Sequence, residues 1–177
     1  MIVNIFIIAY FAASIINDQK RLQNISIIVL SLALLMPAVT SFRLLSAPTL
    51  AKIPKNDSAQ YLNDWPAGYG ISEVVDYLKQ ESKGQDVYVG TEGTFGLLPY
   101  ALNIYFFNKN NVHIYSYWPL DVDKLPDQIL DFAQKGNKTY LIYYQTRKEI
   151  TNPNLRLIAR YQQGVGDSYM RLYQVIP

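Results

Sequence analysis

The sequence predicts an α/β protein in which N-terminal transmembrane helices precede a small extracytoplasmic domain. Apolar residues are concentrated in two runs before residue 46. From residue 71 onward helical and strand-like patterns alternate, which is typical of a mostly parallel sheet with helices on its faces. Two final strand-like runs flank a glycine-containing turn, which indicates a C-terminal antiparallel hairpin. We therefore expect a transmembrane region at 1–45, a linker and ordered loop at 46–70, and an α/β domain at 71–177.

The run at 25–45 is the clearest membrane segment. It has 21 residues and a single charge, Arg43, near its end. A helix of that length measures roughly 30 Å, which matches the hydrocarbon layer of a bilayer. Pro37 is tolerated in a membrane span, where neighbouring groups satisfy the freed backbone. We predict an integral membrane helix, because the chain offers no partner large enough to bury this run on all sides.

The run at 2–16 has only 15 residues. As a helix it would measure roughly 22 Å, which is short for a complete span. No basic residue precedes it, so it fits a signal peptide poorly. A partial or truncated span is the preferred interpretation and a complete span is the alternative. The partial span would be the end of a longer membrane protein whose other helices lie upstream.

Basic residues around the two runs predict the orientation. Lys20 and Arg21 lie together in the short segment between the runs. The positive-inside rule places that segment in the cytoplasm, so the α/β domain is expected outside it. Lys52 and Lys55 follow the second run and weigh against this orientation. The expected location is the cell membrane, with membrane lipid as a partner.

Each element of the domain follows from a local pattern. In 71–82, four apolar residues recur at helical spacing, and Gly84 follows as a helix terminator. Short β-branched and aromatic runs predict strands, and longer apolar or amphipathic runs predict helices. The expected order is helix 71–82, strand 86–90, helix 95–107, strand 112–117, helix 125–133, strand 139–145, and a hairpin of 155–162 with 168–175.

Charge and composition exclude several classes of function. Residues 1–55 hold five of the 16 basic residues and one of the 14 acidic residues, so the remainder is slightly acidic. A nucleic-acid-binding face is therefore not expected. The chain has no cysteine, and His113 is its one histidine. These counts exclude disulfides, thiolate nucleophiles and zinc sites with cysteine or paired histidine ligands. We expect no cofactor and no metal, and no residue is assigned a catalytic role.

The segment Gly90–Gly96, GTEGTFG, is the first candidate site. It lies between a predicted strand and a predicted helix, where open α/β sheets bind ligands. A glycine-rich turn before a helix suits a phosphate, but Glu92 would repel an anion. The preferred interpretation is a tight turn that needs glycine for its backbone. As an alternative to a phosphate site, Glu92 is a candidate to accept hydrogen bonds from sugar hydroxyls, with Thr91 and Thr94 beside it.

Aromatic residues at the next strand end form the second candidate. Tyr117 ends the strand at 112–117 and Trp118 follows it, so both are expected at the same edge as Glu92. With Trp65, Tyr69 and Tyr100 they could form an aromatic wall for a sugar ring or a lipid headgroup. Ordinary packing is the preferred alternative, because tyrosine and tryptophan also occupy half-buried and membrane-interface positions.

Two stretches resemble a known family. They are WPAGYGISEVVDYL at 65–78 and VYVGTEGTFGLLPYAL at 87–102. Preceded by two membrane runs, they resemble the C-terminal end of bacterial C-type-fold membrane glycosyltransferases, which are related to protein mannosyltransferases and the aminoarabinose transferase. The resemblance implies transfer of a sugar from a polyprenyl-phosphate carrier to a glycan acceptor. The family's essential acid lies in an early external loop that nothing in this chain matches.

Two functions are therefore expected as alternatives. The first is the C-terminal membrane-anchored portion of a polyprenyl-phosphate-sugar-dependent glycosyltransferase, which is not catalytic by itself. The second is a free-standing membrane-anchored extracytoplasmic module that binds a glycan or a partner protein.

Overall fold

A computed structural model describes residues 20–94 and 96–177, so the predicted run at 2–16 lies outside the described residues. The chain divides into two compact units, Met1–Ile53 and Pro54–Pro177. The second unit begins before residue 71 and so takes in much of the segment expected to be a linker and loop.

Within the described residues 20–53, the N-terminal unit has one long helix, α2 (Lys20–Ser46), with Pro37 inside it. Over Ile27–Ser46 the helix is long and apolar enough to cross a membrane, and none of the residues in that window is buried. A short 3-10 turn, η1 (Pro48–Leu50), follows. The helix starts earlier than the apolar run, so the backbone of Lys20 and Arg21 is helical rather than part of a loop.

The C-terminal unit contains the predicted elements in the predicted order. The bounds agree with the sequence patterns to within about three residues, as expected for element ends. The elements are α4 (Ile71–Glu81), β1 (Val87–Glu92), α5 (Leu97–Tyr105), β2 (Val112–Tyr117), α6 (Asp127–Gln134), β3 (Lys138–Tyr143), β4 (Leu155–Gln162) and β5 (Tyr169–Val175).

Helical turns between Pro54 and Asp64 were not predicted. A short helix, α3 (Lys55–Ser58), continues into a π-helical turn, η2 (Ala59–Asn63). Leu62 is the one buried residue of these two turns. A segment with a single buried residue has no apolar periodicity, which is the signal that sequence patterns rely on.

The five strands form one sheet in the order β2-β1-β3-β5-β4. β1 pairs in parallel with both β2 and β3, whereas β5 pairs antiparallel with both β3 and β4. The sheet is thus mixed, although four of its strands share one direction. The predicted hairpin is confirmed, and its second strand, β5, is the one that joins the parallel strands.

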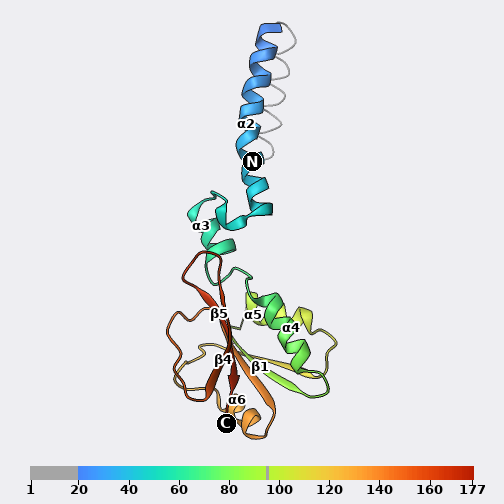
Figure 1. Ribbon diagram of the computed structural model, residues 1–177, viewed down its shortest axis with the longest axis vertical. Helices are drawn as coiled ribbons and strands as arrows, with labels where there is room; N and C mark the ends of the chain where they lie inside the picture. The colour runs from blue at the N-terminus through green and yellow to red at the C-terminus, as the bar shows by residue number, and fades with distance from the viewer. Residues whose placement is uncertain (1–19, 95) are drawn as a thin grey trace. The chain divides into compact units, whose positions relative to one another are not determined.

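Helices cover both faces of the sheet. Alternate residues of β1 and β3, such as Val89 and Ile142, pack with the buried sides of α4 and α5 in one core. Leu141 and Tyr143 face the other way and pack with Ile129 of α6 in a second core. Figure 1 shows α4 and α5 next to each other beside the strands. The period-two alternation of strand side chains produces these two cores.

Candidate functional site

The carboxyl ends of β1 and β2 lie side by side, as predicted. Thr91 is in register with Ser116, and Glu92 is in register with Tyr117. The backbone N–H of Gly93 donates to the carbonyl of Tyr117 at 2.8 Å, which holds the two strand ends together. The structure therefore brings Thr91, Glu92 and Tyr117 to one edge of the sheet.

Glu92 is buried at this edge, and both of its carboxylate oxygens accept hydrogen bonds from the protein. Its Oε2 accepts hydrogen bonds from the backbone N–H groups of Tyr144 at 2.8 Å, Gln145 at 2.7 Å and Thr146 at 3.0 Å. Its Oε1 accepts a hydrogen bond from the hydroxyl of Thr146. A carboxylate has about four acceptor positions. Three donors bind Oε2 and one binds Oε1, which favours a structural role over the expected contact with sugar hydroxyls.

Arg171, which carries the opposite charge, binds the same loop after β3. Its side chain is buried, and its guanidinium donates to the carbonyl of Lys148 at 2.8 Å and to the carbonyl of Thr146. The loop after β3 thus gives its N–H groups to Glu92 and its carbonyls to Arg171. One stretch of backbone thus binds two buried charges, and these hydrogen bonds offset part of the cost of desolvating them, although the buried Nε of Arg171 has no hydrogen-bond partner in the described part of the chain.

The other predicted residues divide between buried and exposed positions. Thr91 is fully buried, and its hydroxyl donates to the carbonyl of Tyr115 at 3.4 Å. Tyr117 is half-buried and donates to the Gln128 side chain at 3.0 Å. Burial raises the pKa of Tyr117 to about 12. Thr94 and Trp118 are exposed, so they are the members of the predicted set that a ligand could reach.

The aromatic residues expected to form a wall are distributed over different places. Trp65 packs edge-on against Tyr144, with ring centroids 5.8 Å apart. Tyr100 is exposed on α5, and Tyr69 lines a hollow at the start of α4. The position of Trp65 is explained by ordinary side-chain packing, which was the interpretation that the sequence favoured.

The glycines of GTEGTFG are explained by the backbone and by close packing. A Cβ on Gly90 would come within 2.5 Å of the Leu141 side chain. Gly93 has φ +93°, and its Cβ would lie 2.9 Å from the Tyr144 hydroxyl. At the start of α5, Leu98 has a non-helical backbone and Pro99 carries no N–H. Such a start offers a poor cradle of amides for a phosphate, in agreement with the preferred interpretation.

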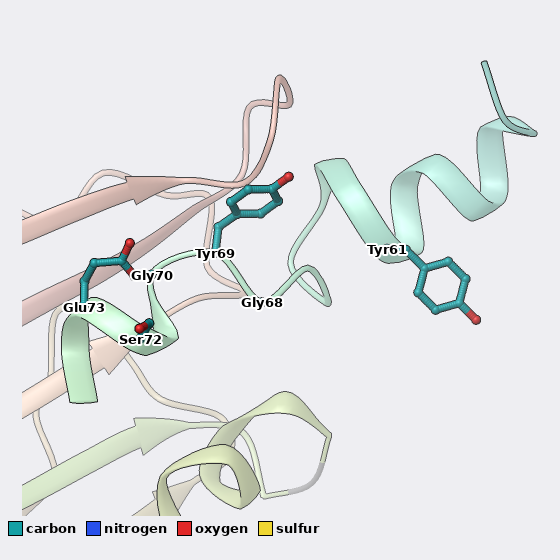
Figure 2. Close-up of a pocket in the computed structure, with 6 residues that line it drawn as sticks. All are labelled: Tyr61, Gly68, Tyr69, Gly70, Ser72 and Glu73. Carbon is teal, nitrogen blue, oxygen red and sulfur yellow. The ribbon is translucent and has the colours of Figure 1, made fainter. Parts of the chain in front are cut away.

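A hollow that the sequence did not predict opens at the start of α4. It has a volume of about 400 Å³ and is lined by Tyr61, Tyr69, Ser72, Glu73 and the glycines of the 68–70 segment. Figure 2 shows the Tyr69 ring and the Glu73 carboxylate rising from the same segment, with Tyr61 on the neighbouring helical turns. Ser72, Glu73 and Tyr61 are exposed.

Close packing shapes this hollow. Gly70 precedes α4 with φ +90°, and a Cβ there would meet the Tyr161 ring at 2.7 Å. Gln163 is buried in the β4–β5 turn and donates to the carbonyl of Tyr69 at 3.2 Å. The segment GYG at 68–70 is the sequence signal for the hollow. Its partners, Tyr161 and Gln163, lie too far along the chain for a local pattern to show them.

Among residues 20–94 and 96–177, no group of three histidine, aspartate or glutamate side chains could hold a metal ion. Comparison of the chain with protein-family models, with curated proteins and with solved structures gave no match.

Proposed function

We propose that this chain is the C-terminal membrane-anchored portion of a polyprenyl-phosphate-sugar-dependent glycosyltransferase and is not catalytic by itself. The observation that carries the proposal is the pairing of an uncovered apolar helix at Ile27–Ser46 with a separate α/β unit. The two stretches that resemble such enzymes form α4, β1, α5 and the loops that bound them. They supply part of the core on one face of the sheet, and the carboxyl end of β1.

The orientation of the anchor is tested by cysteine labelling. The chain has no cysteine, so single cysteines can be introduced without a background signal. We expect Gln134→Cys, exposed at the end of α6, to react with a membrane-impermeant maleimide in intact cells. Gln23→Cys, in the segment expected in the cytoplasm, is the matched control and should react only after the cells are opened. The reverse pattern would overturn the extracytoplasmic placement.

The enzymatic context is tested at the gene. If the chain belongs to a glycosyltransferase, the reading frame upstream encodes a hydrophobic multi-span protein. Joined to that protein, residues 54–177 should be needed for transfer of sugar from a polyprenyl-phosphate carrier to an acceptor. An unrelated upstream region, or full transfer without residues 54–177, would contradict the proposal.

The second function, a free-standing glycan-binding module, is favoured by the hollow at the start of α4. The Tyr69 ring, with the Glu73 carboxylate and the Ser72 hydroxyl on the same segment, provides the stacking surface and the hydrogen-bond partners that sugars require. The test is binding of an envelope-glycan panel to the full chain in lipid nanodiscs. Tyr69→Ala should weaken binding by about tenfold, or about 1.4 kcal/mol.

Tyr169→Ala is the matched control for Tyr69→Ala, because Tyr169 is a half-buried tyrosine that stacks on Arg160 rather than lining the hollow. It should leave binding unchanged. Equal affinity of Tyr69→Ala and the parent chain would exclude the hollow as the glycan site.

A further inference from the structure

The outer side of α5 is an uncovered apolar surface. Tyr100 is 53% exposed, Ile104 is 74% exposed, and Phe107, just past the helix, is 77% exposed. These three side chains and Asn103 line a shallow hollow of about 540 Å³. The opposite side of the same helix is buried through Leu98 and Leu102. A surface helix that is apolar on both sides is expected to have a second apolar partner.

Lysines line a separate hollow at the C-terminal end of α5. The chain continues from α5 into a second hollow of about 470 Å³, which Lys79, Lys83 and Lys109 line together with Tyr105. Lys79 pairs with Asp76 at 3.3 Å, and its Nζ lies 5.9 Å from the centre of the Tyr105 ring. Within the described part of the chain, Lys83 and Lys109 form no ion pair. Their charges are therefore available to an external anion.

We propose that Tyr100, Ile104 and Phe107 dock onto the surface of a lipid bilayer, with Lys83 and Lys109 on its anionic headgroups. The inference rests on the proposed membrane anchor. Tyrosine favours the headgroup level, whereas isoleucine and phenylalanine insert into the acyl boundary beneath it. Each lysine near an anionic membrane adds about 1 kcal/mol of attraction. An anionic bilayer binds surfaces that combine exposed apolar side chains with lysines that form no ion pair.

The short connection between the two units makes the bilayer the favoured occupant. Residues 47–53 join α2 to the second unit and can extend over at most about 25 Å. A tether of this length keeps the lipid surface at a high effective concentration, so that weak docking suffices. Three side chains are too few for a stable interface with a second copy, which needs about 800 Å² from each partner.

The test places a spin label on the docking surface of the full chain. Ile104→Cys and Gln134→Cys, the latter on the opposite face of the sheet, are labelled in vesicles of phosphatidylcholine with phosphatidylglycerol. At Ile104 we expect a several-fold higher ratio of collisions with lipid-soluble oxygen to collisions with a water-soluble nickel chelate. The label at Gln134 should report water. Vesicles without phosphatidylglycerol, or the Lys83→Glu/Lys109→Glu variant, should lower the ratio at Ile104.

Each other result contradicts the docking. A label at Ile104 that reports water in anionic vesicles would show that the surface stays in solution. Coupling between labels of two molecules would show a second copy on the patch, and protection from both reagents would show a protein cover. Vesicle flotation separates this failure from failure of the anchor. A chain that does not float with the vesicles is not anchored, whereas one that floats with Ile104 in water is anchored but not docked.

Discussion

Glu92 and Arg171 are the charged side chains that the described part of the chain buries, and both bind the loop that follows β3. Glu92→Ala would leave three backbone N–H groups without their acceptor. A buried donor without a partner costs about 1–3 kcal/mol. Because Tyr144 is buried and Gln145 and Thr146 are half-buried, we expect a loss of about 2 kcal/mol or more in the free energy of unfolding. Chemical unfolding of the full chain in detergent measures this loss.

Glu149→Ala is the control for Glu92→Ala, because Glu149 is exposed near the same loop. It should change stability by less than about 0.5 kcal/mol. A Glu92→Ala variant that unfolds like the parent chain, yet no longer binds a glycan, would restore the ligand-binding role expected from the sequence.

Buried tyrosines make the domain sensitive to alkali. Burial raises the pKa of Tyr140, Tyr143 and Tyr144 and raises the pKa of Tyr117 to about 12. In the unfolded chain a tyrosine ionises near pH 10. Because the folded pKa values are higher, their contribution to stability is complete below about pH 10 and is lost as the pH rises through the folded values.

We therefore expect a level free energy of unfolding up to about pH 10 and a steep decrease above it. Tyr140→Phe should reduce that slope. At neutral pH it should cost about 1 kcal/mol, because Tyr140 donates to Glu81 at 2.9 Å. Unfolding curves measured across the alkaline range test both effects. An unchanged slope in Tyr140→Phe would show that its burial does not control the transition.

At the scale of elements, Gly→Ala substitutions at three positions distinguish the cost of backbone strain from the cost of a steric clash. Gly70 has φ +90° and meets the Tyr161 ring, Gly84 has φ +78° with nothing within 4 Å of its Cβ position, and Gly68 has open space there. We expect Gly68→Ala to be neutral and Gly84→Ala to cost about 1 kcal/mol from the left-handed backbone. Gly70→Ala should cost more than Gly84→Ala, since it adds the clash.

Thermal unfolding of the three glycine variants measures this order. Equal losses for Gly70→Ala and Gly84→Ala would mean that the Tyr161 ring moves aside without cost.

Elements with a strong period were predictable, and contacts over long sequence separations were not. The apolar spacing in 71–81 and the turn between β4 and β5 are local patterns, and the structure confirms the helix and the hairpin that they predicted. The role of Glu92 depends on Tyr144, Gln145 and Thr146, which lie 52 to 54 residues away. A local pattern contains no information on such distant partners. The sequence alone therefore does not distinguish a buried acceptor of backbone N–H groups from a carboxylate that binds a ligand.

At the scale of the whole molecule, the role of α2 decides between a permanent anchor and a cleaved leader, since both require a long apolar helix. We expect residues 27–46 to remain in the mature chain and to resist extraction from membranes at alkaline pH. Intact-mass measurement of chain purified from membranes tests this expectation. A mass that lacks these residues, together with release into solution, would contradict the anchor.

β5 lies between β3 and β4 in the sheet and pairs with both of them, although it follows both in the sequence. During synthesis the three parallel strands can assemble first, but the outer edge of β3 stays open until Tyr169–Val175 has left the ribosome. An unpaired strand edge invites pairing with other chains. The nascent protein therefore passes through a stage in which a chaperone bound at β3 would protect it from aggregation.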